Sequence, residues 1–200
     1  WNDYGINLNG KILNFNKLFL SPNNVTLEVG FGNGDSLLEM AIQNPNLNFL
    51  GIEVYEAGVG RLINEASKNK LTNLKIIKDD AVEVLNNNIP DDSISHFQLF
   101  FPDPWHKKRH HKRRIVQTSF LDLLTKKLKN NGIVHIATDW ENYAEHIMET
   151  LESHSHFKNC AGDHIYSERP EQRPLTKFEN RGQKLGHGVW DIIFTNLKGG

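Results

Sequence analysis

From residue 25 onward, the sequence alternates short apolar runs with segments whose apolar residues recur at helical spacing. The first unit is the clearest, because a β-branched run over residues 25–29 is followed at once by Gly-Phe-Gly-Asn-Gly at residues 30–34. Residues 37–42 then carry apolar side chains at helical spacing, and Asn44-Pro45 ends the helix. A strand, a glycine turn and a helix in this order predict the opening unit of a doubly wound α/β fold, with helices on both faces of a mostly parallel sheet.

The same alternation predicts the remaining elements. We expect strands at residues 25–29, 49–54, 74–77, 94–101, 133–137 and 189–197. We expect helices at residues 37–42, 59–66, 81–85, 120–128 and 144–151, the fourth closed by the turn at residues 130–132. Residues 1–24 have scattered apolar positions and are predicted to form an arm that packs on the domain. Residues 160–188 form a long polar connection, a kind of segment that often carries function.

Composition limits the classes of protein that fit. The 200 residues, with 38% hydrophobic content, predict one soluble domain over residues 1–200 that includes the arm. The single cysteine, Cys160, excludes an intramolecular disulfide and indicates a cytoplasmic protein. No apolar run is long enough to span a bilayer, and no leader is visible at Trp1; because the chain does not begin with Met, we expect a few residues upstream. The sequence does not decide between a monomer and a homodimer.

The stretch from residue 100 to residue 114 combines three chemistries. It begins at the end of an apolar strand and continues with Pro-Asp-Pro-Trp at residues 102–105, where the prolines must stop the strand. Nine residues with six Lys/Arg and three His follow. Because the formal net charge of the chain is -1, any affinity for nucleic acid must come from a local patch of this kind. The alternative is a solvated, charged loop.

The glycine turn differs from two common phosphate-binding loops. Asp35 stands where the dinucleotide fingerprint has its third glycine, and no Gly-Lys-Ser/Thr follows. The turn instead resembles the cofactor loop of class I S-adenosylmethionine-dependent methyltransferases. That resemblance implies that Glu28 contacts the amino-acid end of the cofactor, that Glu53 accepts from the ribose hydroxyls, and that Asp80 flanks the adenine. The alternatives are a tight turn without a ligand and, for Asp80, a helix N-cap, which is compatible with the adenine role.

Five ordered motifs resemble the tRNA (guanine-N7)-methyltransferases. They are Glu-Val-Gly-Phe-Gly-Asn-Gly at 28–34, Gly-Ile-Glu at 51–53 with Asp-Ala at 80–81, Phe-Pro-Asp-Pro-Trp at 101–105 with the basic run behind it, Thr-Asp-Trp at 138–140, and Thr-Lys-Phe-Glu-Asn-Arg-Gly at 176–182. The resemblance covers residues 28 to about 187. It implies a seven-stranded, Rossmann-like sheet and transfer of a methyl group from S-adenosyl-L-methionine to guanine N7 in tRNA, at position 46 of the variable loop.

The resemblance also implies a role for each site residue. Asp103 is expected to be catalytic, holding the guanine, and to contact the cofactor. The full cofactor set comprises Glu28, Gly30, Gly32, Gly34, Glu53, Asp80 and Asp103. Substrate contacts are expected from Lys107, Asp139, Thr176, Lys177, Phe178 and Glu179, and RNA contacts from Arg109, His110, His111, Lys112, Arg113 and Arg114. Trp105 either stacks on a base or simply packs.

Bland alternatives stay open for two of these places. Asp139-Trp140 could be a helix N-terminus with a core indole, and Lys177 with Glu179 could be an exposed ion pair. A metal site at His154, His156 and Cys160 is not expected, because these do not make the four ligands of a structural zinc site and surface histidines explain the pattern better.

Three rival functions fit these motifs less well. A methyltransferase for exocyclic amines would resemble Asp/Asn-Pro-Pro-aromatic at this strand end, and the second proline is missing here. A nucleic-acid-binding module without cofactor is disfavoured by the intact glycine and carboxylate set, and a cofactor-binding titration would decide. A nicotinamide oxidoreductase is disfavoured by the glycine spacing.

Overall fold

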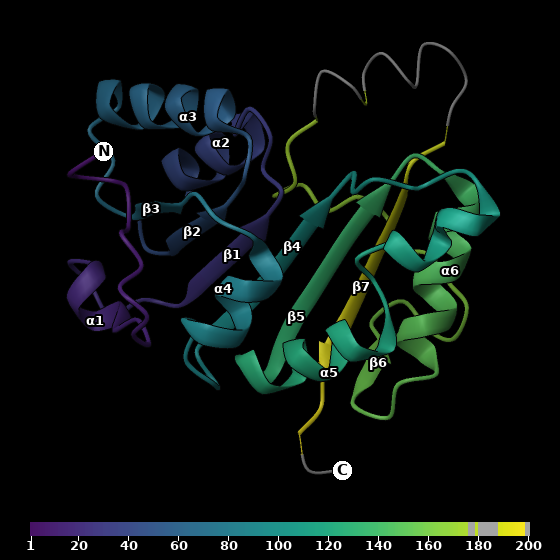
Figure 1. Ribbon diagram of the computed structural model, residues 1–200. Helices are drawn as coiled ribbons and strands as arrows, with labels where there is room; N and C mark the ends of the chain where they lie inside the picture. Colours follow the sequence, from purple (N-terminus) through teal and green to yellow (C-terminus); the bar gives the residue numbers. More distant parts are fainter. Residues whose placement is uncertain (176–178, 180–187, 199–200) are drawn as a thin grey trace.

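The computed structural model describes residues 1–175, 179 and 188–198. It contains a seven-stranded sheet in the order β3-β2-β1-β4-β5-β7-β6. The strands are β1 Val25–Val29, β2 Asn48–Ile52, β3 Leu74–Ile77, β4 Ile94–Phe100, β5 Leu128–Thr138, β6 Phe157–Asn159 and β7 Trp190–Asn196. The helices are α1 Phe15–Leu18, α2 Asp35–Gln43, α3 Glu56–Lys68, α4 Ala81–Asn87, α5 Thr118–Lys127 and α6 Glu141–Glu152, with a 3₁₀ helix over Lys108–Arg113. Figure 1 shows these elements in their places.

The sheet is parallel except around its last strand. β1 pairs with β2 and β4, β2 with β3, and β4 with β5, all in parallel, whereas β7 is antiparallel to both β5 and β6. The predicted doubly wound, mostly parallel sheet is therefore confirmed. The chain moves outward from β1 to β3 and then returns to place β4 on the other side of β1. That reversal creates a crevice beyond the carboxyl ends of β1 and β4, where folds of this class bind ligands.

Alternate strand residues face two separate cores. Leu27 and Leu50 belong to the core that α4, α5 and α6 cover, whereas Phe49 belongs to the core under α2 and α3. Successive side chains of a strand point to opposite faces, so both faces of this sheet must be apolar. Figure 1 shows α2 and α3 on one face and α4, α5 and α6 on the other. Burial on both faces explains why the central strands read as continuous apolar runs.

Two details of the elements differ from the prediction. The helix expected to close at residues 130–132 ends at Lys127, and Leu128 is already extended and pairs with Ile94 of β4. Residues between Leu128 and Ile133 form an irregularity in the ladder, where Asn131 has a φ of 61°. Leu128 is fully buried, so the core recruits it into β5 although its spacing continues the helical pattern. Strand β6 was not predicted, because three residues carry too little periodicity.

The first residues lie against the edge of β3. Tyr4 and Ile6 are buried, and the backbone of both residues bonds to Ile76, at 2.8 Å in each case. The Tyr4 hydroxyl donates to the carbonyl of Ala66 at the end of α3, at 3.0 Å. These contacts cover part of the sheet edge. In the part of the chain that the structure describes, no helix has both the length and the apolarity that crossing a membrane requires.

Candidate active site at the strand ends

The glycine turn leaves its backbone open to a ligand. Gly30, Gly32 and Gly34 have φ values of 71°, 56° and 76°, a region that residues with a Cβ rarely adopt. A Cβ built on Gly30 or Gly32 would meet no atom within 4 Å, so open space lies above both residues. On the other side, a Cβ at Gly58 of α3 would lie 1.9 Å from the Gly32 carbonyl oxygen. The turn therefore packs closely against α3 on one side and has open space on the other.

Glu53 at the end of β2 fixes this turn. Its Oε2 accepts from the backbone N–H of Gly32 at 2.7 Å. Its Oε1 accepts from the N–H groups of Val54 at 2.7 Å and Tyr55 at 2.9 Å, at the start of α3. The carboxylate thus already serves two backbone segments before any ligand binds. A carboxylate oxygen has further lone pairs, so the same group can also accept from a ligand hydroxyl.

Glu28 in β1 is a buried carboxyl group with an orphan oxygen. Its side chain is 3% exposed, and Oε2 has no hydrogen-bond partner among the described residues. Burial, and then the nearby charge of Glu53, raises the pKa of Glu28 to about 8. An unpaired buried carboxyl group is costly, so a cationic or donor group of a ligand that reached it would be stabilised. This orphan oxygen fits the ammonium of an amino-acid ligand.

Asp80 caps α4 and faces the crevice. Its Oδ1 accepts from the N–H groups of Val82 and Glu83, at 2.9 and 3.0 Å. The predicted N-cap is therefore confirmed. Asp79, which the sequence reasoning did not single out, accepts from the Asp80 N–H at 2.8 Å and lies in the same wall. Its position beside a predicted ligand residue was the only signal that could have found it.

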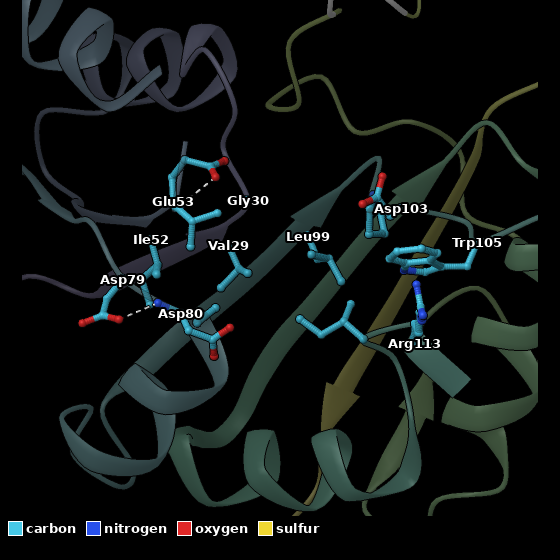
Figure 2. A pocket seen from close by; sticks show the side chains of 14 residues that line it. Val29, Gly30, Ile52, Glu53, Asp79, Asp80, Leu99, Asp103, Trp105 and Arg113 are labelled. Carbon is cyan, nitrogen blue, oxygen red and sulfur yellow. Dashed lines mark hydrogen bonds between the residues drawn. The ribbon is translucent and has the colours of Figure 1, made fainter. Parts of the chain in front are cut away.

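One cavity of ≈ 350 Å³ joins these residues to the Pro-Asp-Pro-Trp loop. Gly30, Glu53 and Asp80 line it from the ends of β1, β2 and β3, and Asp103 and Trp105 line it from the loop after β4. Figure 2 shows Asp103 and Trp105 at the opposite end of the cavity from Asp79 and Asp80. The ends of β1, β2, β3 and β4 therefore meet at one cavity. Glu28 does not line the cavity but lies buried on the α2 side of β1.

The loop that carries Asp103 has an unusual backbone. Phe101 and Trp105, on either side of Pro-Asp-Pro, have φ values of 53° and 45°. Bulky residues in this region cost about 1–3 kcal/mol each, so surrounding contacts must hold them there. The Asp103 carboxylate is exposed, and the Arg113 guanidinium lies over the Trp105 ring at 4.9 Å from its centroid. Such a cation–π contact leaves the indole as part of the cavity wall.

The basic run after this loop divides into two parts. Lys107, Arg109, Lys112 and Arg113 are exposed around the 3₁₀ helix, with His110 and His111 half-buried between them. Arg114, in contrast, is 2% exposed. Its guanidinium donates to the Pro104 carbonyl and to Asn142 Oδ1, at 2.9 Å each, and it lies over the Tyr143 ring. Arg114 is therefore buried, unlike the exposed cations of the run, which can contact a polyanion.

The expected substrate residue Asp139 is exposed directly after β5. Trp140 is the N-cap residue of α6, but its indole is 40% exposed, so the alternative of a core indole is wrong. Its ring instead contacts His106, with 4.2 Å between the ring centroids. This contact joins the start of α6 to the basic run. Asp139 and Lys107, each next to one of the two rings, are thereby brought to the same side of the molecule.

Of the four residues expected at 176–179, only Glu179 lies within the described residues; Thr176, Lys177 and Phe178 lie outside them. Glu179 is buried, and both its oxygens accept from Arg173, at 2.7 Å each. The alternative of an exposed ion pair is therefore wrong for Glu179. Arg173 also donates to both oxygens of Asp191 in β7, at 2.7 and 2.8 Å.

Asp191, which pairs with Arg173, also contacts His135 in β5. His135 Nε2 lies 2.7 Å from Asp191 Oδ1. Although burial raises the pKa of Asp191, the hydrogen bonds from His135 and Arg173 lower it below its usual value overall. Burial acts to lower the pKa of Arg173, but its bonds to Glu179 and Asp191 raise it overall. Sequence reasoning missed Arg173, because a single arginine in a polar connection gives no local signal.

Of the two histidines near residue 155, His156 is exposed as expected and His154 is not. His154 is 9% exposed rather than on the surface, and its Nε2 lies 3.2 Å from Asp122 Oδ1. The Cys160 thiol lies 3.2 Å from the Thr195 hydroxyl. Over residues 1–175, 179 and 188–198, no three His, Cys, Asp or Glu side chains are grouped so that they could hold a metal ion.

Comparisons with known proteins agree with this geometry. Residues 22–192 match the model of a protein family described as "Putative methyltransferase". The tRNA (guanine-N(7)-)-methyltransferase of Shewanella amazonensis is 52% identical over 99% of this chain and 83% of its own length. The protein of the same name from Psychromonas ingrahamii is 53% identical over 98% of this chain and 81% of its own length.

Solved structures extend the likeness of the fold. The 16S rRNA methyltransferase KamB has a TM-score of 0.68 and 16% identity, over 92% of this chain and 93% of that chain. SMU.1697c from Streptococcus mutans, whose structure is a complex with SAH, has a TM-score of 0.57 and 10% identity, over 88% and 89% of the two chains. At these identities the likeness shows the fold alone, which is the class I, Rossmann-like architecture predicted above.

Proposed function

Because the chain belongs to the tRNA (guanine-N7)-methyltransferases, we propose that the cavity at its strand ends is the place of methyl transfer. The enzyme transfers a methyl group from S-adenosyl-L-methionine to N7 of a guanine in tRNA, forming 7-methylguanosine. The guanine lies in the variable loop, at position 46. The reaction takes place in the cytoplasm, where the tRNA substrate is found.

The cofactor residues are those that surround the glycine turn. Gly30, Gly32 and Gly34 let the backbone approach the ligand, and Glu53 accepts from the ribose hydroxyls while it holds the turn. The family resemblance gives Glu28, which is buried next to the glycine turn rather than in the cavity wall, the ammonium of the methionine end. Asp80, in the cavity wall, flanks the adenine. The fit rests on this chain's own geometry: open space above two glycines, an unpaired buried carboxyl group, and carboxylates at the ends of two further strands.

S-adenosyl-L-methionine, when bound, supplies a methyl group on a positively charged sulfur. Guanine N7 has a lone pair and no proton, so the protein does not need to remove a proton before transfer. Transfer of that methyl group to N7 would leave the sulfur neutral and place a positive charge on the guanine ring. Asp103 at the cavity rim contacts both ligands, holds the guanine in line and favours this developing charge.

The tRNA lies on the exposed cations beside this rim. Arg109, Lys112 and Arg113 contact backbone phosphates, with His110 and His111 between them. Trp105 offers its ring for stacking on a base. Lys107 and Asp139 contact the nucleotide, whereas Glu179, which is buried on Arg173, supports the site from behind. Thr176, Lys177 and Phe178 also contact the nucleotide. The proposal for those last three residues rests on the resemblance alone.

One observation carries the proposal: a single cavity of ≈ 350 Å³ is lined by the glycine turn, by Glu53 and Asp80, and by Asp103 and Trp105. A site that only bound nucleic acid would not need the first three. An oxidoreductase would need a different glycine spacing.

The test is methylation of an unmodified tRNA transcript with labelled S-adenosyl-L-methionine, followed by nucleoside analysis. The expected labelled product is 7-methylguanosine. A product methylated on an exocyclic amine would favour the rival methyltransferase class. Cofactor binding without any methylated nucleoside, across a full set of transcripts, would contradict the proposed function.

A further inference from the structure

The Asp103 loop needs support from outside itself. Asp103 lies between two prolines, neither of which can donate a backbone hydrogen bond, and its own carboxylate is exposed. The residues on either side, Phe101 and Trp105, both have left-handed backbone conformations. A catalytic group on such a loop keeps its position only if neighbouring side chains fix the loop.

Arg114 supports the loop after Asp103. Its Nε donates to the Pro104 carbonyl at 2.9 Å, and a second nitrogen donates to Asn142 Oδ1 of α6. The same guanidinium lies 4.7 Å from the centroid of the Tyr143 ring. These contacts use the planar guanidinium on its edge and on its face at once, which a lysine ammonium cannot do. Arg114 therefore joins the loop to the start of α6.

Arg173 supports the loop before Asp103. Its guanidinium lies 5.8 Å from the Phe100 ring and 5.9 Å from the Phe101 ring. It is held in that place by bidentate ion pairs with Glu179 and Asp191, all three side chains being almost fully buried. Arg173 thus joins the end of β4 to Asp191 of β7 and to Glu179.

We propose that Arg114 and Arg173 are positioning residues that hold the Asp103 loop from its two ends for methyl transfer, and that Arg114 does not contact tRNA. The inference rests on the proposed function for its effect on rate. Its structural part, the restraint of residues 100–106, stands independently of any activity. It also gives the last cation of the basic run a role different from that of its exposed neighbours.

The experiment compares the parent with Arg114→Met and Arg173→Lys, and with Arg109→Met as the matched variant from the exposed part of the run. Three quantities are measured: cofactor affinity by calorimetry, single-turnover methylation with both substrates saturating, and amide hydrogen exchange over residues 100–106. We expect Arg114→Met and Arg173→Lys each to lower the single-turnover rate roughly 10–10²-fold, because displacement of a catalytic group by about 1 Å has effects of this size. Exchange of the loop should become faster, and cofactor affinity should stay within about twofold.

Arg109→Met should instead raise the KM for tRNA and leave amide hydrogen exchange over residues 100–106 at the parent level. Chemical rescue provides a second readout, since a low, non-denaturing concentration of guanidinium chloride should restore part of the rate of Arg114→Ala. The same concentration of sodium chloride should not. A residue that serves only general folding would show no such difference.

Several results would overturn the proposal. If Arg114→Met changes only the KM for tRNA, as expected for Arg109→Met, then Arg114 contacts tRNA and does not position the loop. Unchanged loop exchange in folded variants removes the restraint itself. If Arg173→Lys loses both cofactor binding and its cooperative thermal transition, Arg173 serves overall folding and its assignment fails. If the parent forms no 7-methylguanosine, the proposed function fails, while the exchange measurement still decides whether the two arginines hold the loop.

Discussion

The two ends of the cavity are built in different ways. At the cofactor end, carboxylates lie at the ends of parallel strands. Glu53 accepts hydrogen bonds from the backbone N–H groups of Gly32, in the glycine turn, and of Val54 and Tyr55, the two residues that follow it. At the substrate end, Asp103 lies on a loop that contacts Arg114 and Arg173, and Arg114 is in turn bonded to Asn142. The residues of the first end therefore stand in recognisable motifs at successive strand ends, whereas the side chains that fix the second end give no sequence signal of their own. Variants should therefore separate cofactor binding from methyl transfer.

The largest expected effect is on stability at the cofactor end. The pKa of Glu28 is raised to about 8 in the folded protein. The neutral carboxyl therefore contributes stability that is fully present below the unfolded pKa of about 4.3 and is lost as the pH rises toward 8. Glu28→Gln, which removes this titration, should be more stable than the parent at pH 8.5 by up to ~5 kcal/mol, with little difference near pH 4.5. Denaturant unfolding of both proteins without cofactor, across this pH range, measures the difference. A constant difference would show that Glu28 does not titrate in this range.

At the substrate end, Asp103→Ala should reduce methyl transfer and spare cofactor binding. Loss of one preorganised polar contact to a reacting group lowers the rate about 10²–10³-fold. The measurement is a single-turnover rate with both substrates saturating, beside calorimetric titration of the cofactor. A wild-type rate in the variant would remove Asp103 from the site, whereas equal losses in rate and cofactor affinity would end the separation between the two ends.

Glu53→Ala should have the complementary effect. Loss of charge-assisted hydrogen bonds costs on the order of 1.5–3 kcal/mol, and the freed glycine turn adds to this cost. Cofactor affinity should therefore fall while tRNA affinity stays near the parent value. Titration of each ligand separately gives the result, and a variant with parent cofactor affinity would contradict the role of Glu53. Glu53→Gln, which keeps an acceptor for the Gly32 N–H, shows how much of the loss comes from the turn.

The smallest effect should come from the exposed cations. Neutralising Arg109, Lys112 and Arg113 together should flatten the slope of log K for tRNA against log salt by roughly 2–3 units, if each meets one phosphate. Cofactor binding should not change, and the guanosine that is modified should stay the same at high tRNA concentration. The slope is read from tRNA affinities at several salt concentrations. An unchanged slope would mean that the run is a solvated surface.

The difference between the two ends also explains what the sequence could reveal. The strands at 25–29 and 74–77 and the Asp80 cap follow from short, local patterns, and the structure has them at the predicted residues. Arg114 has the same local pattern as Arg113, so nothing within the run distinguishes a buried guanidinium from an exposed one. Its burial depends on contacts with Tyr143 and Asn142 of α6, which lie far from it in the sequence. Arg173 and the exposed indole of Trp140 were unpredictable for the same reason.

We infer that this cavity methylates N7 of one guanine in the variable loop of tRNA. The most direct measurement maps the product, by chain cleavage specific for 7-methylguanosine, on an unmodified transcript and on a transcript in which position 46 is adenosine. We expect one cleavage, at position 46, in the first transcript and none in the second. Cleavage at another position, equal labelling of both transcripts, or methylation at a site other than N7 would contradict it.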